Sequence, residues 1–407
     1  MSPAPTRRGA LAGAAALGFS IDFLGRRAFA ASERELAKKR LVVVICRGGL
    51  DGLSLSPPFG DPAYAALRGA IAIPPPGADG GALDLDGTFG LHPALAATHA
   101  LAVKGEARIA PAVATPDRER SHFEAQDVLE SGGPVVYGTA SGWLNRTLEA
   151  MGPAGKGISI GATAPLILRG RIEAATWSPG GAAARDARLP AILQDLYAHD
   201  PLLGPALASG LATSAEAGMA TAAAGKDLAG APALAPGPSV ARRLGATLAA
   251  FMAADGGPQI AAASLDGFDT HANQGAASGQ LANRIAYLDA FLEGLSANLG
   301  PAWADTVVLA ATEFGRTARV NGASGTDHGT GSTALLLGGA LKRGGIVGDW
   351  PTLAQNRLFE NRDTWPALDM RSLFKGVLRD HLGLDRRALD TAVFPSSAAA
   401  APLSGLV

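Results

Sequence analysis

The sequence predicts a doubly wound α/β fold, with a mainly parallel sheet and helices on both faces. Short apolar runs alternate with longer amphipathic runs along the chain, which is typical of this fold class. Residues 41–45 (LVVVI), 259–265 (QIAAASL) and 306–310 (TVVLA) have the length and composition of buried strands, and we expect them to lie side by side. Each leads into a loop with glycine and acidic residues. Because ligands bind beyond the carboxyl ends of strands in open α/β sheets, these loops should form a site.

The remaining elements are predicted by turn and capping signals. Ser121 and Glu124 have the spacing of a capping box, which opens a helix. Pro93 suits the first turn of another helix. In chain order we expect a turn and short helix from Asp61, an irregular segment at 74–90, a helix at 92–103, a strand at 107–113, a helix at 121–131, a helix at 283–299, a strand at 333–337 and a helix at 371–382.

Composition and charge restrict the class of protein. The chain has 407 residues, and we expect 31–407 to form a single α/β domain with an Ala/Gly-rich insertion of low complexity near 202–238. Lys and Arg number 35 against 36 Asp and Glu, so no basic surplus suggests nucleic acid as a partner. Cys46 is the only cysteine, which excludes an intramolecular disulfide, and its place after an apolar run predicts a core residue.

Residues 1–30 have the pattern of a twin-arginine signal peptide. Arg7 and Arg8 precede a mildly apolar segment, and the sequence AFA at 28–30 has the small-x-small form of a cleavage site. We therefore expect export by the twin-arginine machinery and a soluble mature protein in the periplasm or outside the cell. A disordered or membrane-anchoring amino terminus is the alternative, since Asp22 interrupts the apolar segment. No later segment has the roughly 18 apolar residues that span a bilayer.

The loops after the predicted strands carry candidate metal ligands. Asp51 follows the first strand, Asp269 and His271 follow the second, and Glu313 follows the third, with His328 shortly downstream. Taken alone, an Asp-Gly pair is most often a turn, and a single histidine is more often a satisfied polar residue than a ligand. Unrelated turns have no reason to place acids and histidines just after each of three predicted strands. We therefore expect these side chains to share one polar site. The first interpretation is a metal-assisted hydrolase.

The order of motifs resembles that of a known bacterial family. The motifs LVVVICRGGLDG, SHFEAQDVLESG, LDGFDTHANQ, ATEFGRT and TDHGTGSTALLLGG occur in this order between about 39 and 394. On these motifs the chain resembles an exported bacterial family of unknown function, domain of unknown function family 1501. That family is grouped with the alkaline phosphatase and sulfatase superfamily. The resemblance therefore implies an alkaline phosphatase-like core, a metal centre at the strand ends and a nucleophile at a helix start.

The resemblance also implies roles for individual residues. Asp51 resembles the acid that holds a metal beside the nucleophile. Ser121 falls where that nucleophile would lie, at a helix amino terminus that suits a phosphate or sulfate group. Asp269 and His271 resemble ligands of the other metal, although their spacing is Asp-x-His where the superfamily has Asp-x-x-x-His. His328 resembles the final histidine ligand.

The sequence departs from the superfamily pattern at one position. Glu313 occupies the place of an aspartate, but Phe314 stands where the superfamily has a histidine. One metal, or a rearranged pair that uses Asp327 beside His328, therefore agrees with the sequence as well as a complete two-metal site does. The ion stays open between zinc and calcium, magnesium or manganese.

The predicted reaction is hydrolysis of phosphate or sulfate esters, in a small molecule or a polymer. A divalent ion would stabilise charge on a phosphoryl or sulfuryl oxygen. Ser121 would attack, or would hold the anion while an activated water attacks. Arg316 would bind a substrate oxygen, or would only neutralise the buried acids. His122 would point into the site, or would only pack.

Two other classes of protein stay open. Ser159 lies in a formal G-x-S-x-G pattern, but extended sequence follows it, so a strand is a better interpretation than the nucleophile elbow of a serine esterase. Phe314 also allows a non-catalytic exported protein that binds a ligand, a polymer or an outer-membrane partner. Metal content separates these classes, because the esterase and the scaffold need no metal.

Overall fold

The computed structural model describes residues 35–152, 155–161, 163–178 and 237–407, with scattered positions between 193 and 212. Arg40–Val407 forms one compact unit. The predicted signal peptide at 1–30 lies outside the described residues, as does most of the predicted insertion at 202–238. Within the described ranges, no helix combines the length and the apolar character needed to cross a membrane.

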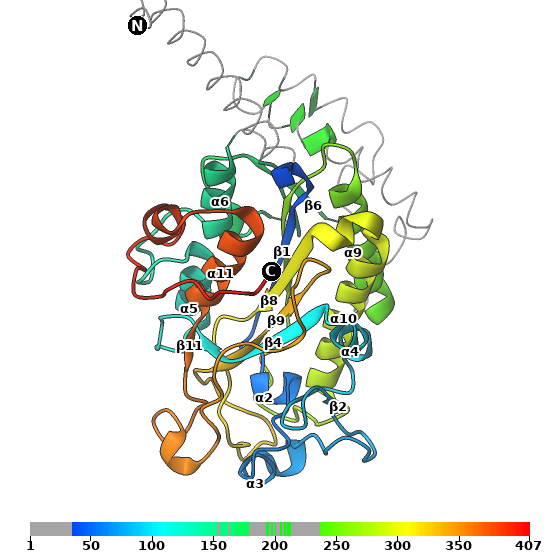
Figure 1. Cartoon of the computed structure of the whole chain (residues 1–407), viewed down its shortest axis with the longest axis vertical. Helices are drawn as coiled ribbons and strands as arrows, with labels where there is room; N and C mark the ends of the chain where they lie inside the picture. The colour runs from blue at the N-terminus through cyan, green and yellow to red at the C-terminus, as the bar shows by residue number, and fades with distance from the viewer. Residues whose placement is uncertain are drawn as a thin grey trace, which may run out of the picture. The chain divides into compact units, whose positions relative to one another are not determined.

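A large mixed sheet lies at the centre of the unit Arg40–Val407 (Figure 1). Its strands follow the order β10-β4-β9-β8-β1-β7-β5-β6, and β11 pairs with β4. β1 is parallel to both β7 and β8, which confirms that the three predicted strands are neighbours with their carboxyl ends at one edge. β9 runs antiparallel to β8 and β4, so the sheet is mainly but not wholly parallel. The strands are β1 (Arg40–Cys46), β4 (Ala107–Ala114), β5 (Gly157–Ile160), β6 (Ala174–Trp177), β7 (Ile260–Leu265), β8 (Thr306–Ala311), β9 (Ser332–Leu337), β10 (Gly345–Ile346) and β11 (Leu368–Asp369).

Helices cover both faces of this sheet, as predicted for a doubly wound fold. α5, α6 and α11 lie on one face, and α4, α9 and α10 lie on the other (Figure 1). These helices are α4 (Ala96–Val103), α5 (His122–Ser131), α6 (Trp143–Met151), α9 (Pro238–Ala253), α10 (Gln280–Asn298) and α11 (Met370–Leu382). The shorter elements are α2 (Gly52–Leu55), α3 (Tyr64–Arg68), β2 (Leu83–Asp84), β3 (Gly90–Leu91), η1 (Gly69–Ile71), η2 (Leu166–Leu168), η4 (Gly300–Asp305), η5 (Gln355–Arg357) and η6 (Ala388–Val393).

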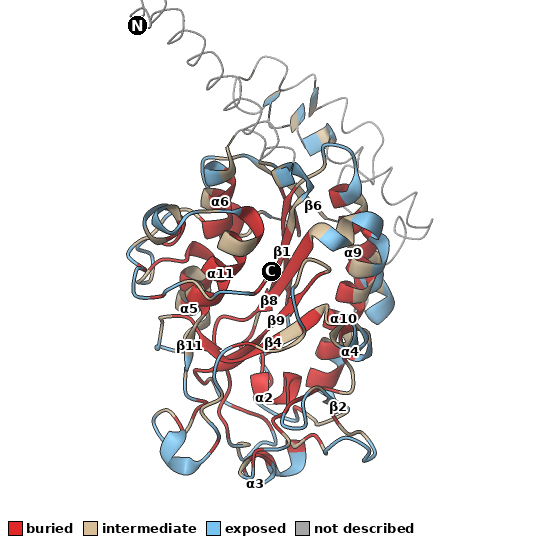
Figure 2. Ribbon diagram, in the orientation of Figure 1, coloured by how far each residue is buried: buried red, intermediate tan, exposed pale blue. Residues whose placement is uncertain are grey.

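The central strands are buried on both faces, as the colouring of Figure 2 shows. Val42 and Val44 of β1 share a core cluster with Leu248 of α9 and Leu288 of α10. The intervening Val43 is also buried, because the second helical layer covers the opposite face. Strands covered on both faces favour continuous apolar runs, which is why the β1 and β8 sequences lack polar alternation.

The start of α4 and the cap of α5 differ from the predictions. α4 begins at Ala96 and not at His92, because His92 Nδ1 accepts a hydrogen bond from the amide of Ala94 at 3.0 Å and holds this stretch as a turn. α5 begins at His122 with Ser121 in the N-cap position. The Ser121 side chain makes no capping hydrogen bond, so the predicted capping box is wrong.

Two interpretations of single residues are confirmed. Cys46 is buried at the end of β1, and burial raises the pKa of its thiol, which disfavours a nucleophilic role. Ser159 lies within β5, and its hydroxyl is 3.0 Å from the hydroxyl of Thr176 on β6. A serine in the middle of a strand lacks the strand-to-helix turn of a nucleophile elbow, so Ser159 does not form the elbow that a serine esterase would need.

Candidate metal centre

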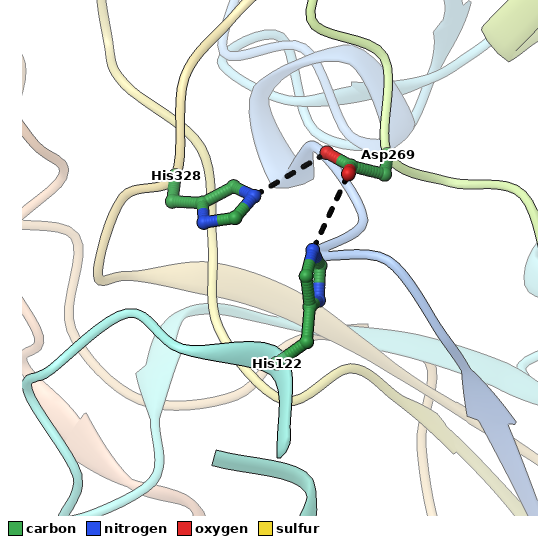
Figure 3. A group of neighbouring side chains, drawn as sticks. All are labelled: His122, Asp269 and His328. Atoms are coloured by element: carbon green, nitrogen blue, oxygen red, sulfur yellow. Dashed lines mark hydrogen bonds and ion pairs between the residues drawn. The ribbon is translucent and has the colours of Figure 1, made fainter. Parts of the chain in front are cut away.

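Loops from the central strands meet the start of α5 at one edge of the sheet. Asp269 lies in the loop after β7, His328 lies in the loop before β9, and His122 is the first residue of α5. One ligand atom from each of these side chains lies within 4.8 Å of the other two (Figure 3). A carboxylate oxygen and two ring nitrogens at this spacing could hold one metal ion. Asp269 and His328 are predicted ligands, whereas His122 is predicted as a catalytic residue.

His122 is oriented by a buried carboxylate. Its Nδ1 lies 2.8 Å from Glu313 Oε1, and its Nε2 lies 3.3 Å from Asp269 Oδ2. Because an ionised carboxylate only accepts hydrogen bonds, Nδ1 carries a proton and Nε2 is directed at Asp269. The hydrogen bond with Glu313 raises the pKa of His122 above its usual value, against the effect of burial. Histidines that bind metals usually have a carboxylate or carbonyl behind them in this way.

Glu313, a predicted ligand, lies behind His122 and outside the group of converging atoms. The carboxylate is fully buried, and it accepts hydrogen bonds from the Gly48 amide at 2.9 Å, Gln126 at 3.1 Å and the Thr312 hydroxyl at 2.9 Å. Burial disfavours ionisation of Glu313, but the hydrogen bond from His122 and these other donors lower its pKa below the usual value. Glu313 thus acts on the site through the His122 ring.

His328 is oriented by a backbone carbonyl. Its Nδ1 lies 2.9 Å from the carbonyl oxygen of Arg120, which can only accept, so Nδ1 carries the proton. Arg120 has φ of 58°, in the left-handed region, and its side chain is held by Asp363 and Glu360. Burial lowers the pKa of His328 and so favours the neutral ring. Its unprotonated Nε2 lies 3.4 Å from Asp269 Oδ1.

His271, another predicted ligand, lies beside this group with its side chain about half exposed. Its Nδ1 lies 3.3 Å from Asp327 Oδ1, and its Nε2 lies 3.0 Å from Asp269 Oδ1 and 3.1 Å from His328 Nε2. Because His328 Nδ1 carries the proton, His328 Nε2 has a free lone pair that faces His271 Nε2. This contact needs either a proton on His271 Nε2 or a cation between the two nitrogens, and a bound cation fits this set of nitrogen and oxygen donors. Asp327, also a predicted ligand, lies behind His271 as Glu313 lies behind His122.

Asp269 is shared between the histidines and Arg316. The buried guanidinium donates from Nη1 to Asp269 Oδ1 at 2.6 Å and from Nε to the Thr326 hydroxyl at 3.1 Å. Burial disfavours the charged form of Asp269, but the hydrogen bond and charge of Arg316 lower its pKa below the usual value. The structure shows Arg316 paired with an acid, in line with the second of its two predicted roles, although Asp269 is exposed and not buried.

Asp51, the remaining predicted ligand, is not brought to the others. Its Oδ2 pairs with Arg68 and accepts hydrogen bonds from Gln274 Nε2 at 2.7 Å and from the Ser54 hydroxyl at 2.9 Å. Its Oδ1 accepts from the Leu53 amide at 3.2 Å, at the start of α2. Both Asp51 and Arg68 are buried, and a buried guanidinium requires an anionic partner. Asp51 supplies that partner.

Phe314 closes one side of the group. Its ring centroid lies 4.9 Å from that of His122 and 4.7 Å from that of His328. A Cβ atom placed on Gly49 would come within 2.5 Å of the Phe314 ring, so the phenylalanine is tightly seated. An apolar ring therefore fills the position where the resemblance implies a histidine ligand. Among the described residues, the geometry offers one metal position here, and Ser121 directly precedes its candidate ligand His122 in the chain.

Sequence reasoning did not identify the residues that support the ligands. Gln126 follows His122 by one helical turn, and this spacing is a signal that could have identified it. The Arg120 carbonyl and the Gly48 amide act through the backbone, where residue type gives no signal. Glu313 is predicted as a ligand but supports a histidine ring, whereas His122 is predicted as a catalytic residue but belongs to the converging group. This difference depends on which of the two side chains is more deeply buried, and only the packed structure shows that.

The chain matches none of the curated proteins with which it was compared. It does match the family described as "Protein of unknown function (DUF1501)", over residues 38–393. That range contains the central sheet from β1 onward and every residue of the candidate metal centre. The match agrees with the family resemblance of the ordered motifs. The chain therefore belongs to the DUF1501 family.

Proposed function

We propose that this protein is an exported, metal-dependent hydrolase of phosphate or sulfate esters. The observation that carries the proposal is the convergence of His122, His328 and Asp269 at the carboxyl edge of the sheet. The ring protons of both histidines are held on the far side, by Glu313 and by the Arg120 carbonyl. Metal ligands need this arrangement, because it leaves Nε2 of each ring available.

The donor set favours zinc among the ions considered. Calcium and magnesium take mainly oxygen ligands, whereas imidazole nitrogen suits zinc and other transition metals. His122, His328 and Asp269 would be the ligands, with His271 next to them as a fourth nitrogen donor. When bound, the ion would supply Lewis-acid stabilisation of charge that develops on the ester oxygens.

The chain's own groups would bind and orient the ester. Arg316 keeps Asp269 anionic, and the rings of His328 and His271 face the same space. The free amides in the first turn of α5 suit an anionic oxygen, and Ser121 precedes them. Ser121 would either attack the ester or hold the anion while a water attacks.

A non-catalytic metal-binding protein is the second candidate. The observation that favours it is the Phe314 ring against His122 and His328, which removes the second metal that the superfamily resemblance implies. Such a protein would bind the ion and an anionic ligand without turnover. Metal content would then be normal, and no ester would be hydrolysed.

Two variants separate these functions in the metal-loaded protein, assayed with methyl and aryl esters of phosphate and sulfate. His328→Ala should lose both the metal and hydrolysis. Ser121→Ala should keep the metal and, if the hydroxyl is the nucleophile, lose turnover by orders of magnitude. Because Ser121 makes no capping hydrogen bond, its removal should cost less than the ~0.5–2 kcal/mol typical of an N-cap. A metal-loaded wild type that hydrolyses none of these esters would favour the non-catalytic candidate.

A further inference from the structure

A cavity is lined by side chains of α5 that adjoin the candidate metal centre in the chain. Its volume is about 650 Å³, which is in the range of sites for organic ligands and far larger than a phosphate or sulfate group needs. Its walls include Phe123 and Gln126 of α5, Tyr137 in the following loop, Arg47 after β1, and Ser264 near the end of β7.

The cavity adjoins the metal centre through shared side chains. Gln126 lines it and donates to Glu313 at 3.1 Å, and Arg47 donates to the Gln126 side chain at 2.5 Å. Phe123 directly follows His122 in the chain. The cavity wall and the candidate ligand His122 are thus joined through Glu313 and through the first turn of α5.

Two aromatic rings stand exposed at the cavity wall. The exposed fraction is 81% for Phe123 and 71% for Tyr137. Tyr137 has φ of 55°, an uncommon left-handed conformation, and its amide donates to Asp127 of α5 at 2.7 Å. Backbone strain of this kind persists where the surrounding structure enforces it, and it is concentrated at functional sites. The backbone at Tyr137 is thus held by a specific contact that keeps this residue at the cavity wall.

Polar groups line the rest of the cavity. The Ser264 hydroxyl is buried and has no hydrogen-bond partner among the described residues, which is costly unless a ligand supplies one. Asp266 is exposed at the same wall. Arg47 is paired with Glu130 at 2.5 Å, so its charge is already neutralised. The cavity therefore combines aromatic surface with hydrogen-bonding groups and provides little net positive charge for a second anion.

We propose that this cavity binds the alcohol part of the ester, and that this part is a hydroxylated ring of the carbohydrate type. The apolar face of such a ring would lie on Phe123 or Tyr137, while its hydroxyl groups would pair with Ser264 and Asp266. A purely apolar group would leave the Ser264 hydroxyl unpaired, and a second phosphate would meet three acids, Asp127, Glu130 and Asp266, against two arginines, Arg47 and Arg169. The proposal rests on the proposed ester hydrolysis for its reaction, but binding in the cavity can be measured without turnover.

Kinetics with two kinds of substrate test the proposal. The metal-loaded chain is assayed with glucose and N-acetylglucosamine 6-phosphates and 6-sulfates, and with methyl phosphate and methyl sulfate. The kcat/KM ratio of the best sugar ester to its methyl ester should exceed tenfold in the wild type. Tyr137→Ala and Ser264→Ala should each reduce that ratio at least fivefold, mainly through KM. Val103→Ala removes an equally exposed apolar side chain, 76% exposed on α4, that is not part of the cavity wall, and it should leave the ratio unchanged.

Equal ratios in the wild type and in Tyr137→Ala would overturn the cavity assignment while leaving ester hydrolysis in place. If the wild type hydrolyses no ester, the proposed reaction fails, and binding of unesterified glucose and N-acetylglucosamine is then measured by saturation-transfer NMR. Binding that is weakened by Tyr137→Ala would support the carbohydrate cavity without the reaction. No binding to the wild type would overturn it.

Discussion

Glu313 controls the protonation of His122 without reaching the group of converging atoms. Its hydrogen bond is the largest cause of the raised pKa of His122. Glu313→Gln should therefore lower the pKa of His122 in the metal-free protein, and it should weaken metal binding about 10–100-fold, as is typical when a supporting carboxylate is lost. NMR titration of the His122 ring protons and a metal titration measure the two effects. An unchanged pKa would show that Glu313 is not the group that holds this ring.

The two histidine ligands have opposite pH dependences in the metal-free protein. The pKa of His122 is raised, so its contribution to stability is complete below its ordinary pKa of about 6.5 and is lost as pH rises through the raised value. Burial lowers the pKa of His328, so its contribution is present above the ordinary pKa and is lost as pH falls through the lowered value. Metal binding needs both Nε2 atoms free of protons, so its affinity should increase as pH rises through the pKa of His122. Glu313→Gln should move that increase to lower pH.

Asp51 should matter for stability and not for metal binding. It is buried against Arg68, and loss of one partner from a buried ion pair costs about 3–5 kcal/mol. We expect Asp51→Asn to lower the free energy of unfolding by an amount in this range, measured by denaturant titration. Metal content should stay at the wild-type level. Loss of the metal with unchanged stability would restore Asp51 as a ligand.

The loop between β1 and α2 brings the carboxyl edges of two strands together. Gly48 in this loop has φ of 115°, and a Cβ atom there would lie 2.5 Å from the amide nitrogen of Asp269. Its own amide also donates to Glu313 at 2.9 Å. Gly48→Ala should therefore move the loop that carries Asp269 and weaken metal binding, besides a strain of about 1–3 kcal/mol.

Gly77→Ala is the matched control for this loop. Gly77 also has positive φ, at 87°, but a Cβ atom there would meet nothing within 4 Å. It should lower the melting temperature through strain alone and leave metal affinity unchanged. Equal losses of metal affinity in the two variants would mean that the Gly48 contact does not position Asp269.

The strands and most helices could be predicted from sequence, because their signals are local. β1 and β8 are buried on both faces, so their apolar runs are unbroken and unambiguous. The start of α4 was predicted too early because Pro93 suits a helix, whereas the competing hydrogen bond from Ala94 to His92 depends on the ring orientation. The residue types of the candidate site, acids and histidines in the loops after the strands, could also be predicted. Which of the acids lies among the converging ligand atoms could not, because it depends on contacts between residues as far apart as His122 and Glu313, which are 191 positions apart in the sequence.

The fold assembles the candidate metal centre from segments that only a complete sheet brings together. His122 and Asp269 are separated by 147 positions, and His328 lies in the loop that leads into the antiparallel strand β9. The mixed sheet, which the sequence predicts as mainly parallel, thus contributes a candidate ligand through the loop before its antiparallel strand. A bound ion would stabilise the folded chain over the unfolded chain, because the ligands meet only after folding.

Export can be tested on the full chain. Arg7 and Arg8 lie in the segment with the twin-arginine pattern, and a second arginine pair, Arg26 and Arg27, lies closer to the predicted cleavage site. Conversion of Arg7 and Arg8 to lysine should retain the protein in the cytoplasm, because the translocation signal requires that pair. Conversion of Arg26 and Arg27 to lysine should leave export unchanged. Cell fractionation measures both, and export of the first variant at the wild-type level would contradict the proposed route.

Elemental analysis of the folded protein tests the metal centre most directly. After zinc loading and removal of free ion, we expect roughly one ion per chain in the wild type, since three converging ligands define one site. His328→Ala and Asp269→Ala should lose it, whereas Asp51→Asn and Ser121→Ala should retain it. A wild-type protein that binds no stoichiometric metal, or a His328→Ala variant that keeps it, would contradict the assignment of His122, Asp269 and His328 as the ligands.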